Sequence, residues 1–321
     1  MAKNYEHVMD YSPEWKKKTG ELDFPMTSDY LFRALLQKDE KTLKALVATF
    51  LKVDPERINE IEITNPIVLG ESITDKEYHL DVKVLVDNNL KMNLEMQVLR
   101  HEGWIERTLV YACREFDDLN KGDDYTKVLG IWQISFCCFD LFEDDPEFLS
   151  DFMLINTKKP QQVYTDKFRI SFLNLKRIDL AAKENASEDL INWARLFSAK
   201  SWEELRMLAD NNIIMDQAIS SVSKLTEDKR IRDEIWRRED NERIELTNKN
   251  AYNRVVEESN RKDIIISDQE KTINEQAVEL EKQADELKKK VDELEKQAAE
   301  IEHLKELLKK MGSDTSDTLK C

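Results

Sequence analysis

Residues 78–98 read YHLDVKVLVDNNLKMNLEMQV and contain two stretches, 78–86 and 90–98, in which apolar and polar side chains alternate. The three residues Asp87-Asn88-Asn89 join these stretches. Alternation with a period of two is typical of half-buried strands, and a short Asp/Asn-rich connection is typical of a hairpin turn. The sequence therefore predicts a β-hairpin with one apolar face and one polar face.

The register of this hairpin decides which polar side chains meet. With a three-residue loop, and with Asn89 in the left-handed conformation, the two strands pair outward from the residues that flank the loop. This register puts two acids opposite each other. The pairs on the polar face are then Asp81 with Glu95, His79 with Gln97 and Lys83 with Asn93. A two-residue Asn88-Asn89 turn would shift the register by one and separate the acids.

Opposed carboxylates on paired strands repel each other unless a positive charge lies between them. A hard divalent cation such as Mg²⁺ would remove that repulsion, because Mg²⁺ is held by one or two carboxylates together with water and phosphate oxygens. Such a site suits phosphodiester hydrolysis. The alternative is a solvated polar face on which Lys83 and Asp81 form a plain surface pair, and the spacing alone leaves both interpretations open.

The segments around the hairpin predict an α/β arrangement. Apolar residues at helical spacing indicate two short helices within 29–51, broken near Lys38 and Asp39, and Ser28 is a suitable N-cap. The remaining expected strands lie at 58–63, 128–139, which is buried, and 168–175. A helix is expected at 104–119, with Ile105, Leu109, Ala112 and Phe116 on one stripe. The segment 187–240 is expected to form helices without a strand.

The C-terminal part carries a heptad repeat. Seven apolar residues recur every seven positions, at Ile266, Ile273, Leu280, Leu287, Leu294, Ile301 and Leu308. Taking these as d positions places Ala277, Ala284, Val291, Ala298 and Lys305 at a, which is the spacing of a left-handed coiled coil. We expect a homodimer or small homo-oligomer, although a single solvated helix rich in ion pairs is the alternative.

Composition and charge exclude several functional classes. The chain of 321 residues has only 6 Gly and 6 Pro, which indicates much helix, and its formal net charge of -17 argues against a general basic coat for nucleic-acid phosphates. No apolar run is long enough for a membrane span, and the four cysteines lack a C-x-x-C pair, so we expect a soluble cytoplasmic protein with reduced thiols. Phosphate-loop, dinucleotide and serine-hydrolase motifs are missing.

Several motifs together resemble one known family. Leu80-Asp81-Val82-Lys83 followed by Asn93-Leu94-Glu95-Met96-Gln97 resembles the PD-(D/E)XK nuclease family transposases, also called recombination-promoting nucleases. The resemblance extends from about residue 20 to 250. Further matching segments are 29–36 in the opening helix, Arg107 with Tyr111 after the hairpin, 121–125 before the central strand, and 172–175.

The resemblance implies a restriction-endonuclease-like mixed sheet flanked by helices, which cuts DNA with Mg²⁺ or Mn²⁺. It implies Asp81 and Glu95 as metal ligands, a third oxygen from the carbonyl of Met96, and Gln97 at the position where the wider superfamily has a lysine. Glutamine can orient a water molecule but adds no positive charge. Accessory candidates are Lys83 or Lys76 as the replacement cation, Asp29 as a further acid near the metal, and Arg107 and Tyr111 as contacts to phosphate and base.

These interpretations divide the chain into a nuclease-like core at 1–180, a helical extension at 181–250, a coiled coil at 251–311 and a disordered tail at 312–321. The function expected is a metal-dependent DNA endonuclease acting in recombination or with mobile elements. Two alternatives remain. One is a catalytically weak or inactive relative that binds DNA or a partner, and the other is a coiled-coil assembly protein with a globular head.

Overall fold

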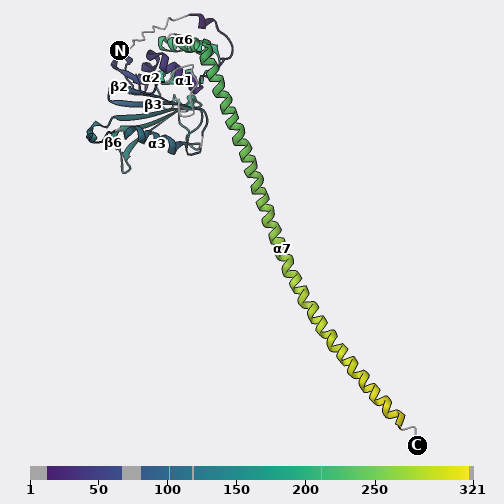
Figure 1. The fold of residues 1–321 in the computed structure, drawn as a ribbon. Coiled ribbons are helices and arrows are strands. Elements are labelled where there is room, and N and C mark those ends of the chain that lie inside the picture. Colours follow the sequence, from purple (N-terminus) through teal and green to yellow (C-terminus); the bar gives the residue numbers. More distant parts are fainter. Residues whose placement is uncertain (1–12, 67–80, 101, 118, 211, 318–321) are drawn as a thin grey trace. The chain divides into compact units, whose positions relative to one another are not determined.

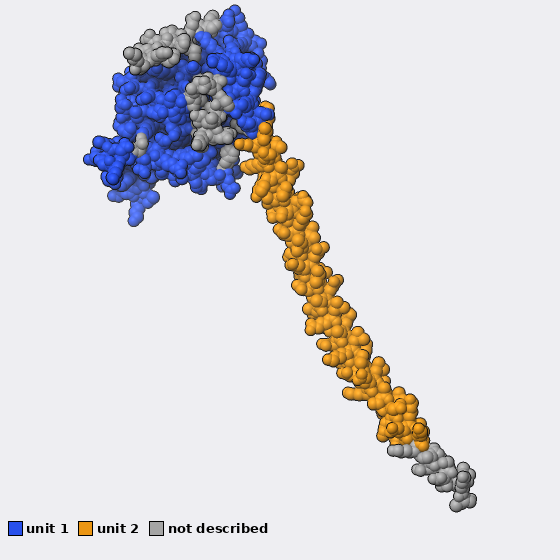
Figure 2. Space-filling view, viewed as in Figure 1, with its two compact units in different colours: residues 1–241 blue, residues 242–321 orange. Residues whose placement is uncertain are grey.

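The computed structural model describes residues 13–66, 81–100, 102–117, 119–210 and 212–317. The chain forms two compact units, residues 1–241 and residues 242–321 (Figure 2). Their boundary lies inside the long helix α7 (Lys229–Asp317), which continues past residue 311, where the coiled coil was expected to end. The division of residues 1–250 into a core and a helical extension stays a prediction.

The first unit is built around a mixed six-stranded sheet, as the sequence predicts. Strands β1 (Ile61–Ile63), β2 (Val82–Val86) and β3 (Leu90–Gln97) are antiparallel neighbours, and β4 (Gly130–Cys137) lies parallel to β3. Strand β6 (Lys159–Asn174) is parallel to β4, and β5 (Leu149–Asn156) pairs with β6 at the edge. Strand β5 was not predicted, because its residues Phe152 to Ile155 are exposed and show no alternation.

The hairpin has the register predicted from the three-residue loop. Val82 pairs with Leu94, and Lys83 pairs with Asn93. The left-handed residues of the loop are Asp87 and Asn88, with φ of 46° and 53°, and the expectation that Asn89 takes this conformation was wrong. Two consecutive left-handed residues make the tight turn that suits the twist of paired strands, and the N–H of Asn89 closes it by donating to the Val86 carbonyl over 3.0 Å.

The apolar face of the hairpin is covered by the helices that precede it. Helices α1 (Asp29–Lys38) and α2 (Glu40–Leu51) separate at Asp39, as predicted. The hydroxyl of Ser28 caps α1 by accepting from the Leu31 N–H, and Asp39 caps α2 by accepting from the Thr42 N–H. The core on this face is formed by buried residues that include Tyr30, Leu35, Leu46, Val82, Leu94, Ile134 and Phe136.

Helices α4 (Glu188–Ser198), α5 (Trp202–Ala209) and α6 (Ile213–Glu227) complete this layer, with α6 against α1 and α2. Figure 1 shows α1, α2 and α6 gathered beside the sheet, away from α3 (Trp104–Phe116). As predicted, the segment from 187 to 240 is helical. Among the described residues, no helix is both long enough and apolar enough to cross a membrane.

Helix α3 lies against β4 on the other face of the sheet, and its orientation corrects the sequence analysis. The residues of α3 that are buried against the sheet are Trp104, Thr108 and Ala112. Ile105 and Leu109, which were expected on the inner side, are 39% and 47% exposed. The indole of Trp104 packs against the rings of Phe139 and Phe172 and anchors the start of the helix in this orientation.

Candidate active site

The polar face of the hairpin places the two predicted acids at its open end. Asp81 immediately precedes β2, and the register that pairs Val82 with Leu94 continues to bring Asp81 opposite Glu95. Their side chains are only 12% and 17% exposed. The predicted partner His79 and the accessory candidate Lys76 lie outside the described residues.

Two side chains that were not predicted from the sequence hold the backbone at Asp81 through hydrogen bonds. The guanidinium of Arg33, a buried residue of α1, donates hydrogen bonds to the carbonyls of Asp81 and Asn65. The Asn65 amide donates to the Asp81 carbonyl over 3.0 Å and accepts from the Lys83 N–H over 2.9 Å. Helix α1 and the segment after β1 thereby set the position of the first acid.

Glu95 is a carboxyl group in an unusual environment. Arg107 Nη2 lies 3.0 Å from its Oε1, and the Gln133 amide lies 3.4 Å from its Oε2. The pKa of Glu95 is raised to about 7, chiefly because the carboxyl is buried; Arg107 opposes the increase, and the charge of Asp81 adds to it. A pKa perturbed by burial and by a neighbouring like charge is typical of functional sites.

Gln97 is held by protein groups on both sides of its amide. Its Nε2 donates to the Leu99 carbonyl over 2.7 Å, and its Oε1 accepts from Arg107 over 3.1 Å. The Arg107 guanidinium also lies over the ring of Tyr111, 5.9 Å from its centroid. The structure therefore brings Glu95, Gln97, Arg107 and Tyr111 together, and their catalytic and DNA-contacting roles stay predictions.

Lys83 lies on the same face and provides a positive charge. Its Nζ is 2.5 Å from Glu115 Oε1 and 4.0 Å from Asp81 Oδ2. Burial lowers the pKa of Lys83, but the hydrogen bond to Glu115 and the charges of Asp81 and Glu115 outweigh that effect and leave the pKa raised. The side chain is therefore a permanent cation at neutral pH and is unsuited to act as a base.

Asp29 begins α1 and contacts a different part of the unit. Its carboxylate accepts from the Tyr30 N–H over 2.6 Å and lies 3.7 Å from Arg238 of α7. Burial raises the pKa of Asp29, and the charge of Arg238 opposes this increase. These contacts connect Asp29 with the first turns of α7, and its role near a metal stays a prediction.

Buried polar residues of β3 and β4 lie beneath Glu95. The Asn93 amide donates to Gln133 over 2.7 Å, and Gln133 in turn reaches Glu95. Ser135 is fully buried next to Glu95 in the parallel register. This polar layer was not predicted, although the polar residues at two-residue spacing in the apolar segment 130–137 indicate it.

The donor set at this site fits a hard divalent cation. Glu95 of β3 and Asp81, which directly precedes β2, provide carboxylate oxygens opposite each other, and the charge of Asp81 contributes to the raised pKa of Glu95. Among the described residues, no group of three or more His, Cys, Asp or Glu side chains is arranged to hold a metal. Any further ligands would be carbonyls, water or substrate oxygens, which is the usual situation for Mg²⁺.

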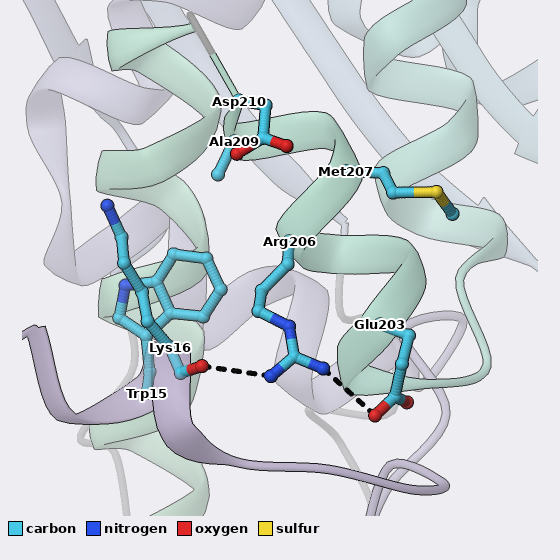
Figure 3. Close-up of a pocket in the computed structure, with 7 residues that line it drawn as sticks. All are labelled: Trp15, Lys16, Glu203, Arg206, Met207, Ala209 and Asp210. Atoms are coloured by element: carbon cyan, nitrogen blue, oxygen red, sulfur yellow. Dashed lines mark hydrogen bonds and ion pairs between the residues drawn. The ribbon is translucent and has the colours of Figure 1, made fainter.

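A pocket of about 390 Å³ lies elsewhere in the first unit, between the 3₁₀ turn Pro13–Lys17 and α5. Figure 3 shows Arg206 at its centre, donating to the Lys16 carbonyl and to Glu203, both over 2.9 Å. Its lining residues are Trp15, Lys16, Glu203, Arg206, Met207, Ala209 and Asp210. None of them belongs to the carboxylate site.

The fold and the site define the class of protein. A helical layer, an antiparallel hairpin bearing Asp81 and Glu95-x-Gln97, and a following helix with a parallel strand form an α/β nuclease-type core. Residues 26–254 match the family model described as PD-(D/E)XK nuclease family transposase, and the chain belongs to this family. The predicted resemblance is thus confirmed. No curated protein and no solved structure matched the chain.

Proposed function

We propose that this protein is an endonuclease that hydrolyses phosphodiester bonds of DNA with Mg²⁺ or Mn²⁺ as its cofactor, in the context of recombination or mobile elements. The observation that carries the proposal is the hairpin register, which sets Asp81 opposite Glu95 on a face that also holds Lys83 and that Arg107 of α3 contacts. Membership of a nuclease family supports the substrate class. We further propose that the protein acts in the cytoplasm.

The proposed roles follow from the chemistry of each group. Asp81 and Glu95 would hold the cation, with the Met96 carbonyl as a third oxygen. A bound divalent cation supplies charge neutralisation at the scissile phosphate and a more acidic water. Lys83 adds a fixed positive charge for the phosphate, because its pKa is raised. Arg107 can donate to phosphate oxygens, since guanidinium groups pair well with them.

Gln97 supports a second candidate function. Its amide is already used by Leu99 and Arg107, so orienting a water molecule would require it to exchange one of these hydrogen bonds. A nuclease-fold protein that binds DNA or a partner without cutting would keep Gln97 in this structural role. The net charge of -17 agrees with the partner-binding form of this candidate, because it limits non-specific attraction to DNA.

The second unit is proposed to join chains into a homodimer or small homo-oligomer. The d-position residues of α7 from Ile266 to Leu308 are 52% to 68% exposed in the single chain. Burial of this stripe against the same stripe of a second copy would stabilise a dimer, because apolar side chains at heptad spacing interlock between helices. Alanine at three a positions limits the area buried at each layer.

Cleavage of supercoiled plasmid DNA tests the proposal. Wild-type protein is compared with Asp81→Asn and Glu95→Gln, each with Mg²⁺, with Mn²⁺ and with EDTA. Asp285→Asn is the matched control, because Asp285 is an exposed carboxylate of the second unit. Nicking or linearisation by wild type and control, but by neither site variant, is the expected result. If the wild type binds DNA without metal and cleaves it in none of these conditions, the second candidate, a nuclease-fold protein that binds without cutting, is favoured.

A further inference from the structure

Helix α3 exposes a short apolar stripe next to the carboxylate site. Ile105, Leu109 and Val110 are 39%, 47% and 46% exposed, and the thiol of Cys113 is exposed as well. Residues at positions i, i+4, i+5 and i+8 lie on one side of a helix. This side is distinct from the buried side of Trp104 and Ala112. The stripe therefore serves neither the core of the unit nor the site itself.

The charges at the edge of the stripe are arranged symmetrically. Glu106 lies four residues before Val110, and Arg114 lies four residues after it. Both side chains are exposed, and neither has an ion-pair partner among the residues that the structure describes. If two α3 helices pack antiparallel about a twofold axis near Val110, each Glu106 faces Arg114 of the other helix. Leu109 then packs near Leu109 of the second copy, so the surface is complementary to itself.

We propose that the α3 stripe is an interface between two copies of this chain. A second copy is favoured over a nucleic acid because the stripe is apolar and Glu106 would repel phosphates. A membrane is an unsuitable occupant because residues 105–113 extend over only about 12 Å, at roughly 1.5 Å per residue. The interface would bring the carboxylate sites of the two copies close to each other. In each copy, α3 carries the stripe on one side and Arg107, Tyr111 and Glu115, which lie at the carboxylate site, on another.

A small interface of this kind depends on a second connection between the chains. The proposal therefore rests on the dimer proposed for α7, which would hold the two first units at high effective concentration. The two proposals fail in different ways. The mass of the full chain in solution tests the α7 dimer, whereas the position of chemical cross-links tests the α3 interface.

The experiment is cysteine cross-linking in the full chain with Cys113→Ser and Cys321→Ser, which removes the exposed Cys113 thiol and the terminal one. Val110→Cys is compared with Ile214→Cys, a control on α6 that has similar exposure at 38%. Under mild oxidation with diamide, the Val110→Cys protein should form a covalent dimer at least tenfold faster than the control. Equal rates, or no cross-link at Val110, would overturn the proposal.

Charge reversal is an independent test in the same background. Glu106→Arg should slow cross-linking through Val110→Cys at least fivefold, because each interface then contains like charges. Adding Arg114→Glu should restore the rate, because the pairs are again opposite in sign. Both residues are exposed, so tryptophan fluorescence should show that the fold is unchanged. A double variant as slow as Glu106→Arg would show that these residues do not face each other.

Discussion

Replacement of Glu95 by glutamine should change how the stability of the metal-free protein depends on pH. Burial raises the pKa of Glu95 from 4.5 to about 7. Each unit of difference between folded and unfolded states corresponds to about 1.4 kcal/mol, so ionised Glu95 reduces the free energy of unfolding by about 3 kcal/mol at high pH. Glutamine has a similar shape and no proton to lose, and it removes this penalty.

The sign follows from which state releases its proton first. Below pH 4.5 both states hold the proton, and Glu95 has no effect. Between pH 4.5 and 7 the unfolded chain releases the proton while the folded chain keeps it, so the stability of the wild type falls as pH rises. We therefore expect Glu95→Gln to gain about 2 to 3 kcal/mol relative to wild type between pH 5 and pH 8.

Urea unfolding in EDTA, followed by tryptophan fluorescence, measures this difference. All six tryptophans lie in the first unit, so the signal reports on the unit that contains Glu95. Glu62→Gln is the control, because Glu62 is an exposed glutamate of strand β1 in the same sheet. A difference between Glu95→Gln and wild type that stays constant from pH 5 to pH 8 would refute the assigned burial effect.

Three further predictions concern other parts of the molecule. Lys83→Met should slow DNA cleavage at least tenfold, whereas Lys91→Met, on the adjacent strand, should have little effect. Equal cleavage rates for Lys83→Met and wild type would show that Lys83 has no role in cleavage. Truncation after Asn241 should convert an oligomer into a monomer in light scattering, and a wild-type monomer at micromolar concentration would contradict the α7 dimer. Asp39→Ala should lower the free energy of unfolding by about 3 kcal/mol in urea titrations, because its buried carboxylate accepts hydrogen bonds from Thr42, Gln217 and Ser221; a loss below about 1 kcal/mol would contradict this.

Much of the fold was predictable because the responsible interactions are local. The break between α1 and α2 at Asp39, the cap at Ser28 and the three-residue hairpin loop all depend on residues within four positions of one another. The heptads of α7 are likewise a property of spacing. The opposition of Asp81 and Glu95 follows from the loop length, because strand alternation leaves no other pairing once the loop is set.

The rotation of α3 was not predictable from its own sequence. Its apolar residues suggested that Ile105 and Leu109 face inward, yet the sheet beneath α3 presents Gln133, Ser135 and the acids. The helix therefore turns Trp104 and Ala112 inward and brings Arg107 to Glu95. Strand β5 was missed for a related reason, since only its pairing with β6 makes it a strand.

The sequence by itself determined the hairpin with its polar face, the helices before it, the heptad repeat and the family. It allowed two registers for the hairpin, and the structure selects the one that sets Asp81 opposite Glu95. Only the tertiary structure decided how those acids are held and how acidic they are. Arg33 reaches Asp81 across 48 residues of chain, and Gln133 reaches Glu95 across 38. The raised pKa of Glu95 depends on burial by such distant segments. Local spacing carries no information about burial of that kind, because it exists only after the layers have packed.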